Sequence, residues 1–163
     1  MKKLLATISV LVLMLGVTAC TAPASEDKNL EGEIPDLIKT VIENADINED
    51  FKGMLTSATQ TMEITDEFKV HALGADTYEF VEGYFCEPMM SSQAFSLVML
   101  RAKDAASAAT LAEEIKTTVD PVKWVCVSVP EEDVQTATIG DMVFLIMAED
   151  SEKFVESFNS LAE

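Results

Sequence analysis

The sequence predicts an α+β fold, with a mostly antiparallel sheet of about four to five strands and helices packed on one face. Two dense apolar runs of strand length, at 94–102 and 142–147, predict the centre of the sheet. Two apolar-rich runs around Gly140-Asp141 indicate a hairpin and therefore antiparallel pairing. Segments with apolar residues at helical spacing lie before, between and after these runs, which completes the α+β pattern.

The first element is a helix in IPDLIKTVIENA, residues 34–45. Pro35 suits the first helical turn, where its missing N–H leaves no hydrogen bond unmade. The apolar residues repeat at helical spacing and predict an amphipathic helix packed on the core (Leu37, Ile38, Val41 and Ile42). The pattern weakens over 51–62, where we expect a short helix or a turn.

Two strands joined by a turn follow. Strand-forming residues gather between Tyr78 and Phe85, and Pro88 limits this strand or places it at an edge. The apolar run AFSLVMLRA, residues 94–102, is the second strand. We expect the chain to turn at 89–92, between the two.

A helix and a second hairpin complete the fold. Asp104 can cap the helix AASAATLAEEIKTTV, and Asp120-Pro121 ends it. VKWVCVSV, residues 122–129, is a third strand candidate. The hairpin spans 134–148, and its MVFLIM segment is apolar on both faces, so we expect a central strand. Apolar residues at helical spacing predict a last helix in SEKFVESFNSLAE.

The N-terminus has the pattern of an exported lipoprotein. Lys2 and Lys3 precede an apolar run, 4–16, that is shorter than the roughly 20 residues of a comfortable membrane span. Val17-Thr18-Ala19-Cys20 resembles the bacterial lipobox, in which the cysteine thiol receives a diacylglycerol and the chain is cut just before it. The alternatives are an ordinary signal peptide, or a transmembrane anchor, with an incidental Cys20.

These features divide the chain into three parts. Residues 1–19 form the expected lipoprotein signal peptide, 20–32 a lipidated flexible tether, and 33–163 a single α+β domain of about 130 residues. Two acyl chains on Cys20 make a stable anchor. We therefore expect the protein on the extracytoplasmic face of the cell membrane, with the membrane as a partner through that lipid.

The charge of the chain excludes one class of partner. There are 11 basic and 29 acidic residues, for a net charge of −18, and without the two lysines of residues 1–19 it becomes −20. Nucleic acid is excluded, because phosphate neutralisation needs clustered lysine and arginine. Flat adsorption to anionic lipid is disfavoured for the same reason. The acidity serves solubility, or else it attracts cations or a basic partner.

Cys86 and Cys126 remain once Cys20 is assigned to lipid. An even pair in an exported chain can form one disulfide, here closing a loop of about 40 residues. Such a bond stabilises the fold by roughly 3–4 kcal/mol in the chain-entropy model. The alternative is two buried free thiols that behave as small apolar side chains.

No catalytic set stands out in the sequence. His71 is the only histidine, and we expect it at the surface or at a strand edge. DINEDFKGMLTS has alternating ligand-type residues, but Phe51 and Ser57 stand where a calcium loop needs Gly and Glu, so we interpret it as a turn at a helix end. Five acidic residues are candidates for the paired carboxylates of a hydrolase (Glu82, Glu87, Glu131, Glu132 and Asp133). Chance pairs are expected among 29 acids, so we predict no catalytic residue, no metal site and no cofactor.

Met89 and Met90 lie beside Pro88 at the expected tip of the first hairpin. Methionine side chains are flexible, and two of them at a tip can form an adaptable contact surface. We nevertheless expect both to pack into the core, and the contact surface is the alternative.

One stretch resembles a known family. PMMSSQAFSLVMLRAKD, followed by a helix and by a hairpin with a Gly-Asp turn before MVFLIM, is similar to the domain of unknown function 4358 family over roughly residues 34–150. The resemblance implies a small exported lipoprotein with an α+β layout. It implies no catalytic residues.

These observations favour a non-enzymatic, lipid-anchored module that presents a sheet face or a hairpin edge to an envelope protein or another envelope component. The alternatives are a carboxylate-dependent hydrolase of envelope polymers, and a lipoprotein that binds a small ligand or a cation. Convergent carboxylates in a deep pocket would favour the enzyme, and an exposed apolar patch would favour the interaction module.

Overall fold

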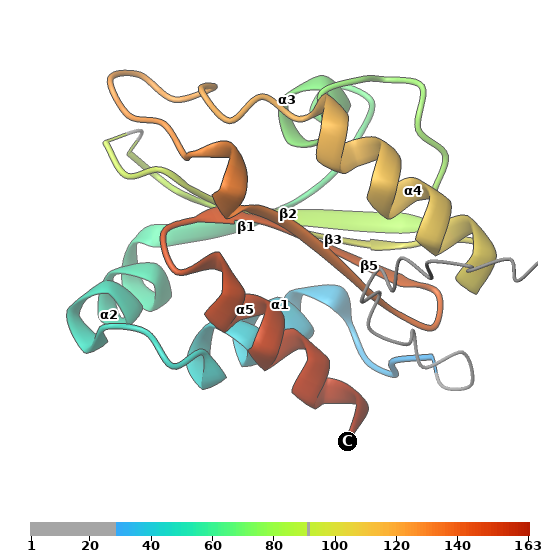
Figure 1. Cartoon of the computed structure of the whole chain (residues 1–163), viewed down its shortest axis with the longest axis horizontal. Coiled ribbons are helices and arrows are strands. Elements are labelled where there is room, and N and C mark those ends of the chain that lie inside the picture. The colour runs from blue at the N-terminus through green and yellow to red at the C-terminus, as the bar shows by residue number, and fades with distance from the viewer. Residues whose placement is uncertain (1–28, 91) are drawn as a thin grey trace, which may run out of the picture.

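The computed structural model describes residues 29–90 and 92–163. Five strands form one antiparallel sheet in the order β1-β2-β3-β5-β4 (Figure 1). The strands are β1 (Thr59–Glu63), β2 (Glu82–Pro88), β3 (Phe95–Arg101), β4 (Val134–Ile139) and β5 (Met142–Ala148). The predicted α+β class with a mostly antiparallel sheet is confirmed, and β5 is an inner strand as its two apolar faces predict.

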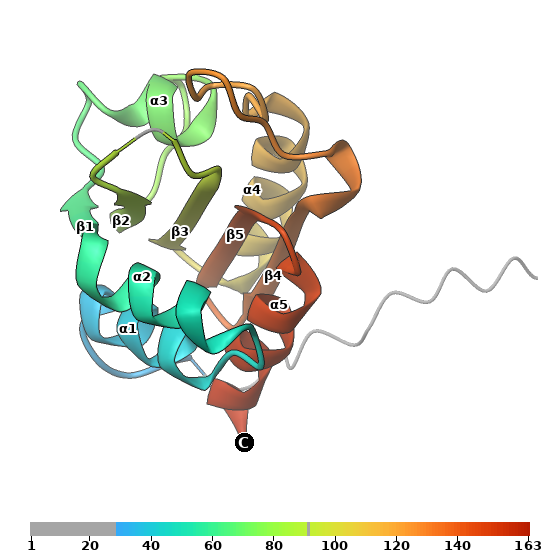
Figure 2. The same ribbon diagram turned by 90° about the vertical axis from the view of Figure 1, so that its left-hand side faces the viewer.

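Helices cover both faces of the sheet, so the prediction of helices on one face is wrong. The helices are α1 (Ile34–Asn44), α2 (Glu49–Ala58), α3 (Lys69–Leu73), α4 (Ala105–Thr118) and α5 (Ser151–Asn159), with 3-10 turns η1 (Glu131–Asp133) and η2 (Ser160–Ala162). Figures 1 and 2 show α1, α2 and α5 on one face, which we call the α1 face. The other face, which carries α3 and α4, is the α4 face.

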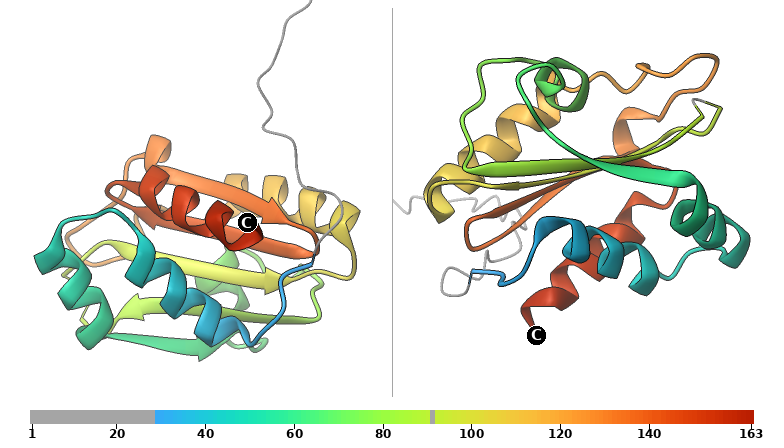
Figure 3. Two further views of the ribbon diagram at one scale, coloured as in Figure 1. Left: turned by 90° about the horizontal axis from the view of Figure 1, so that it is seen from below. Right: turned by 180° about the vertical axis from the view of Figure 1, so that it is seen from behind.

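The inner strands explain the second helical layer. β3 is buried at its first six residues, and β5 is buried at all seven. Side chains of a strand alternate between the two faces, so both faces of β3 and β5 present apolar groups. A single helical layer would leave half of these groups in water. Figure 3 shows the sheet from below and from behind, held between the two layers.

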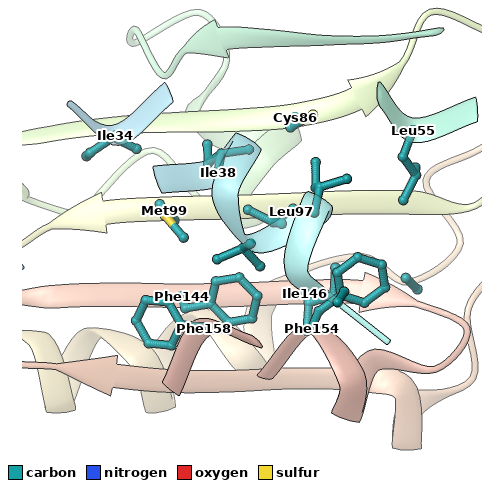
Figure 4. Close-up of a cluster of buried hydrophobic side chains, with 14 of the residues drawn as sticks. Ile34, Ile38, Leu55, Cys86, Leu97, Met99, Phe144, Ile146, Phe154 and Phe158 are labelled. Atoms are coloured by element: carbon teal, nitrogen blue, oxygen red, sulfur yellow. The ribbon is translucent and has the colours of Figure 1, made fainter. Parts of the chain in front are cut away.

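The core of the α1 face joins two helices to the inner strands. Ile34 and Ile38 of α1 are fully buried and pack in one cluster with Leu97 (Figure 4). Phe144 of β5 stacks on Phe158 of α5, with ring centroids 4.7 Å apart. Burial of each such side chain contributes about 1.5–3 kcal/mol, so this cluster fixes α1 and α5 on the sheet.

The core of the α4 face is built around α4. Leu111 and Ile115 of this helix pack in one cluster with Val98 and Leu145 of the sheet. Asp104 caps the helix as predicted, because its Oδ1 accepts a hydrogen bond from the backbone N–H of Ser107 at 2.8 Å.

Three local predictions need correction. Residues 122–129 form an irregular loop and no strand, since Cys126 has a φ of 68°, outside the extended region. Tyr78 lies before β2, which begins only at Glu82. β1 was not predicted, because its sequence TQTME is mostly polar and its side chains are exposed or half-buried.

The first described residues of the chain contact the sheet at the end of β3 that carries Arg101. Arg101 Nη1 donates to the carbonyl oxygen of Leu30 at 3.1 Å, and Nη2 donates to that of Gly32 at 3.3 Å. The backbone N–H of Asp141 donates to Asn29 Oδ1 at 3.1 Å.

The predicted signal peptide and Cys20 lie outside the described residues. Within those residues, no helix has the length and apolar character to span a bilayer.

Candidate functional site

Four residues meet on the α4 face, near the turn between β2 and β3. Lys123 Nζ lies 2.6 Å from Glu87 Oε1 and donates to Ser96 Oγ at 3.1 Å and to the carbonyl oxygen of His71 at 3.2 Å. The Oε2 atom of Glu87 lies 2.8 Å from Nε2 of His71. We call these four residues the Lys123 cluster.

Strand alternation places two members of the cluster on the α4 face. Cys86 belongs to the core of the α1 face, so its neighbour Glu87 points to the other face. Ser96 points the same way, between Phe95 and Leu97 of the α1-face core. α3 supplies His71, and the loop after α4 supplies Lys123.

The cluster holds opposite charges in a largely buried setting. Burial raises the pKa of the Glu87 carboxyl, but the hydrogen bond from His71 and the charge of Lys123 outweigh this effect and lower it to about 2. Burial lowers the pKa of Lys123, and the Glu87 carboxylate opposes that change. The Lys123 ammonium also lies 5.3 Å from the centroid of the Trp124 ring, within the range of a cation–π contact.

The cluster has pair types that occur in nucleophilic catalysis, but its geometry suits a structural role. A serine beside a lysine, and a histidine beside a carboxylate, are both used to activate nucleophiles. Ser96 is 0% exposed, so no substrate carbonyl can reach its hydroxyl. The Lys123 ammonium is engaged by the Glu87 carboxylate. The arrangement therefore ties α3 and the loop after α4 to the sheet.

Two loops at one end of the sheet expose apolar side chains (Figure 1). Met89 and Met90 follow Glu87 in the β2–β3 turn, and Val122 and Val125 flank Lys123 in the loop after α4. All four side chains are exposed, from 62% for Val122 to 73% for Met90. Figures 1 and 3 show both loops at the same end of the sheet. We call these four residues the apolar tip.

The apolar tip lies at the opposite end of the strands from residues 29–32, the first described part of the chain (Figure 1). β3 begins with Phe95 beside the β2–β3 turn and ends with Arg101, which binds the backbone of Leu30 and Gly32. Its seven residues span about 20 Å in extended form. Figure 1 shows the two loops at the left and the first described residues at the right.

Cys86 and Cys126 are both free thiols, so the disulfide that was one of the two predictions for this pair is not formed. Cys86 is buried in the core of the α1 face, whereas Cys126 is exposed in the loop after α4. That loop packs on the α4 face through Val129 and Trp124, so the sheet separates the two residues. The other prediction was two buried free thiols. It is right for Cys86, but Cys126 is exposed.

The predicted carboxylate candidates do not converge. Glu82 and Glu87 alternate to opposite faces of β2, and Glu82 binds Arg101 Nε at 2.9 Å. Glu131, Glu132 and Asp133 lie together in η1. Within 29–90 and 92–163, no three His, Cys, Asp or Glu side chains gather as ligands of a metal would.

The calcium-like segment, residues 46–57, contains the N-cap and most of α2, so the expectation of a turn at a helix end is wrong for most of it. The Oδ1 atom of Asn48 accepts hydrogen bonds from the backbone N–H groups of Asp50 and Phe51, at 2.9 and 3.2 Å. Its alternating polar residues therefore serve as an N-cap and as acids of a first helical turn.

His71 lies at the surface, as predicted, but on α3 and away from a strand edge. The prediction missed its partnership with Glu87, and it missed Lys123 altogether. One signal was present in the sequence: Lys123 is the only charged residue in the apolar segment VKWVCVSV. A lone charge in such a segment is expected to seek a buried partner.

Comparisons with protein-family models, with curated proteins and with solved structures find no match to this chain.

Proposed function

We propose that this protein is a lipid-anchored extracytoplasmic lipoprotein that acts as a non-enzymatic interaction module, with the apolar tip as its contact surface. The observation that carries the proposal is that the two loops at the end of the sheet opposite residues 29–32 expose Met89, Met90, Val122 and Val125 (Figure 1). Solvated apolar side chains of this size gain free energy when a partner covers them.

The anchor is supported by the N-terminal sequence and by the position at which the chain joins the sheet. Cys20 is the expected lipid acceptor, and residues 21–28 separate it from the first described residue. Because the expected tether is flexible, the anchor leaves the domain free to turn the apolar tip away from the membrane. A partner that extends into the envelope can then reach the tip.

The sheet-face version of the interaction hypothesis is not part of the proposal, because helices cover both faces. The hairpin version remains, since the β2–β3 turn carries two exposed methionines. Membership in the domain of unknown function 4358 family belongs to the same proposal. It rests on the sequence resemblance over roughly residues 34–150.

Mass spectrometry of the N-terminal peptide of the mature protein tests the anchor. We expect a peptide that begins at Cys20 and carries a diacylglycerol on its sulfur. Cleavage at another bond, or an unmodified Cys20, would overturn this part of the proposal. The Cys20→Ala variant, expressed at the same level, is the control for the lipid-dependent mass.

A further inference from the structure

The β1 strand leaves one margin of the sheet open. It is the first strand in the sheet order, and Figure 2 shows it at the margin. Its two flanking residues pair with β2: Ile64 N–H donates to Gly83 O at 2.8 Å, and Met89 N–H donates to Ala58 O at 3.0 Å. Hydrogen-bonded pairs of an antiparallel ladder recur at every second residue. Between Ala58 and Ile64, Gln60 and Met62 therefore face β2.

The alternate residues of β1 turn their backbone groups away from the sheet. These residues are Thr59, Thr61 and Glu63. Among the described strands, β1 has β2 as its one neighbour, so the N–H and C=O of Thr61 face away from the sheet, and Thr61 is exposed. An open edge of this kind can pair with an added strand.

A cavity opens beside this edge on the α1 face. Thr59 and Thr61 line it from β1, Ile38 and Ile42 line it from α1, and Cys86 lies at its wall. Figure 4 shows Ile38, Cys86 and Leu55, another lining residue, within the core of this face. Its volume is about 240 Å³, below the roughly 300–1,000 Å³ of sites for drug-sized ligands. The size suits one apolar side chain.

We propose that β1 accepts an extended peptide of a partner protein as a sixth strand, with one apolar side chain of that peptide in the cavity. Residues opposite each other on neighbouring strands have Cβ atoms about 4.5–5.5 Å apart on the same face. A side chain opposite Thr61 on the α1 face therefore reaches the mouth of the cavity. Backbone hydrogen bonds supply affinity in this mode of recognition, and the cavity supplies specificity.

A second copy of this chain does not fit the edge. If β1 paired with β1, the α1 face of the added strand would present Thr59, Thr61 and Glu63, and none of these is a large apolar side chain that could pack against Ile38, Ile42 and Leu55 of the cavity. The net charge of −18 on each copy also opposes the pairing. The same charge favours a basic peptide, and Glu63 at the end of the edge can pair with one of its lysines or arginines.

This site borders the apolar tip, since Met89 pairs with Ala58 at the start of β1, but it does not rest on the proposed function. It uses the β1 edge and the α1 face, whereas the tip uses the β2–β3 turn and the loop after α4. Variants at Met90 and at Thr61 therefore distinguish the two surfaces.

The proposal is tested on the full chain in detergent. Binding peptides are first selected from a phage-displayed library of linear eight-residue peptides. The affinity of the selected peptides is then measured by fluorescence anisotropy. Thr61→Pro removes an outward N–H and leaves the ladder with β2, because proline is tolerated at such edge positions. Thr61→Val is its control, since it keeps the N–H. Thr56→Phe places a ring at the cavity, and Ser57→Phe, next to it on α2 and not a lining residue, is the matched control. Circular dichroism melts check that each variant folds.

We expect selected peptides with one apolar residue and with lysine or arginine beside it. Thr61→Pro and Thr56→Phe each weaken their binding at least tenfold, while Thr61→Val and Ser57→Phe change it less than twofold. Binding that survives Thr61→Pro, or a selection that enriches no peptide over that variant, would overturn the proposal. Dimerisation of the wild type that Thr61→Pro abolishes would assign the edge to a second copy and would overturn it as well.

Discussion

Lys123 Nζ lies 2.6 Å from Glu87 Oε1, and the two side chains are 7% and 12% exposed. This contact joins the loop after α4 to the end of β2. Removal of one partner leaves the other charge buried without compensation, which destabilises a protein by about 3–5 kcal/mol. We therefore expect Glu87→Gln or Lys123→Met to lower the free energy of unfolding in urea by about 3 kcal/mol.

The double variant Glu87→Gln with Lys123→Met separates charge from packing. It should be more stable than either single variant, because no unpaired charge remains. The exposed pair Lys39–Glu43, at 3.7 Å, is the control. Its removal should change stability by less than about 1 kcal/mol. Additive losses in the Lys123–Glu87 double variant would contradict the proposed coupling.

The low pKa of Glu87, about 2 against an ordinary 4.5, predicts an acid-dependent part of the stability. The folded state holds the proton more weakly than the unfolded chain, so Glu87 stabilises the fold above about pH 4.5, and this contribution is lost between about pH 4.5 and 2. We expect the Tm difference between the wild type and Glu87→Gln to shrink as the pH falls through this window. A difference that stays constant from pH 7 to pH 2 would show that Glu87 has no such role.

Gly74 predicts a large effect of a small substitution. This residue follows α3 with φ 81°, and an added Cβ would lie 2.1 Å from the carbonyl oxygen of Thr118. Gly74→Ala should therefore lower the free energy of unfolding by more than about 2 kcal/mol. Gly53 in α2 has no atom within 4 Å of such a Cβ, so Gly53→Ala should raise stability by about 0.5–1 kcal/mol. Equal effects at the two positions in urea unfolding would contradict the close approach of α3 and α4.

The two free thiols predict different reactivity. Cys126 is exposed, whereas Cys86 is buried and its burial raises the pKa of the thiol. In lipid-modified protein, Ellman's reagent should label Cys126 rapidly and Cys86 only after unfolding in urea. Cys126→Ser should remove the fast phase. Denatured, unreduced protein that releases no thiol would indicate a disulfide and would contradict the structure.

The sequence predicts the regular elements well where one periodicity dominates. α1, α4 and the β4–β5 hairpin lie where apolar spacing, the Asp104 cap and the Gly140-Asp141 turn place them. The segment VKWVCVSV was wrongly predicted as a strand, because its apolar residues are typical of one. It forms a loop that packs on a sheet face, where the Lys123 side chain is buried. β1 is not predicted, because its residues are polar and show no strand pattern. Its place in the sheet depends on pairing with β2, which lies some 20 residues further along the chain.

The candidate site is harder to predict than the fold. Met89 and Met90 are predicted at a tip from Pro88 and the turn, and they are exposed there. The contribution of Val122 and Val125 depends on the contact between Lys123 and Glu87, which are far apart in the sequence. The second helical layer has the same origin, because only the sheet order shows that β3 and β5 are both covered on two sides.

Site-specific photo-crosslinking in intact cells tests the central claim most directly. A benzophenone amino acid at Met90, in the apolar tip, is compared with one at Lys103, which is exposed near the tether end of the sheet. We expect one reproducible protein adduct from position 90, absent from position 103 and lost in the Cys20→Ala variant. The same adducts from both positions, or none from position 90 in folded and anchored protein, would contradict it.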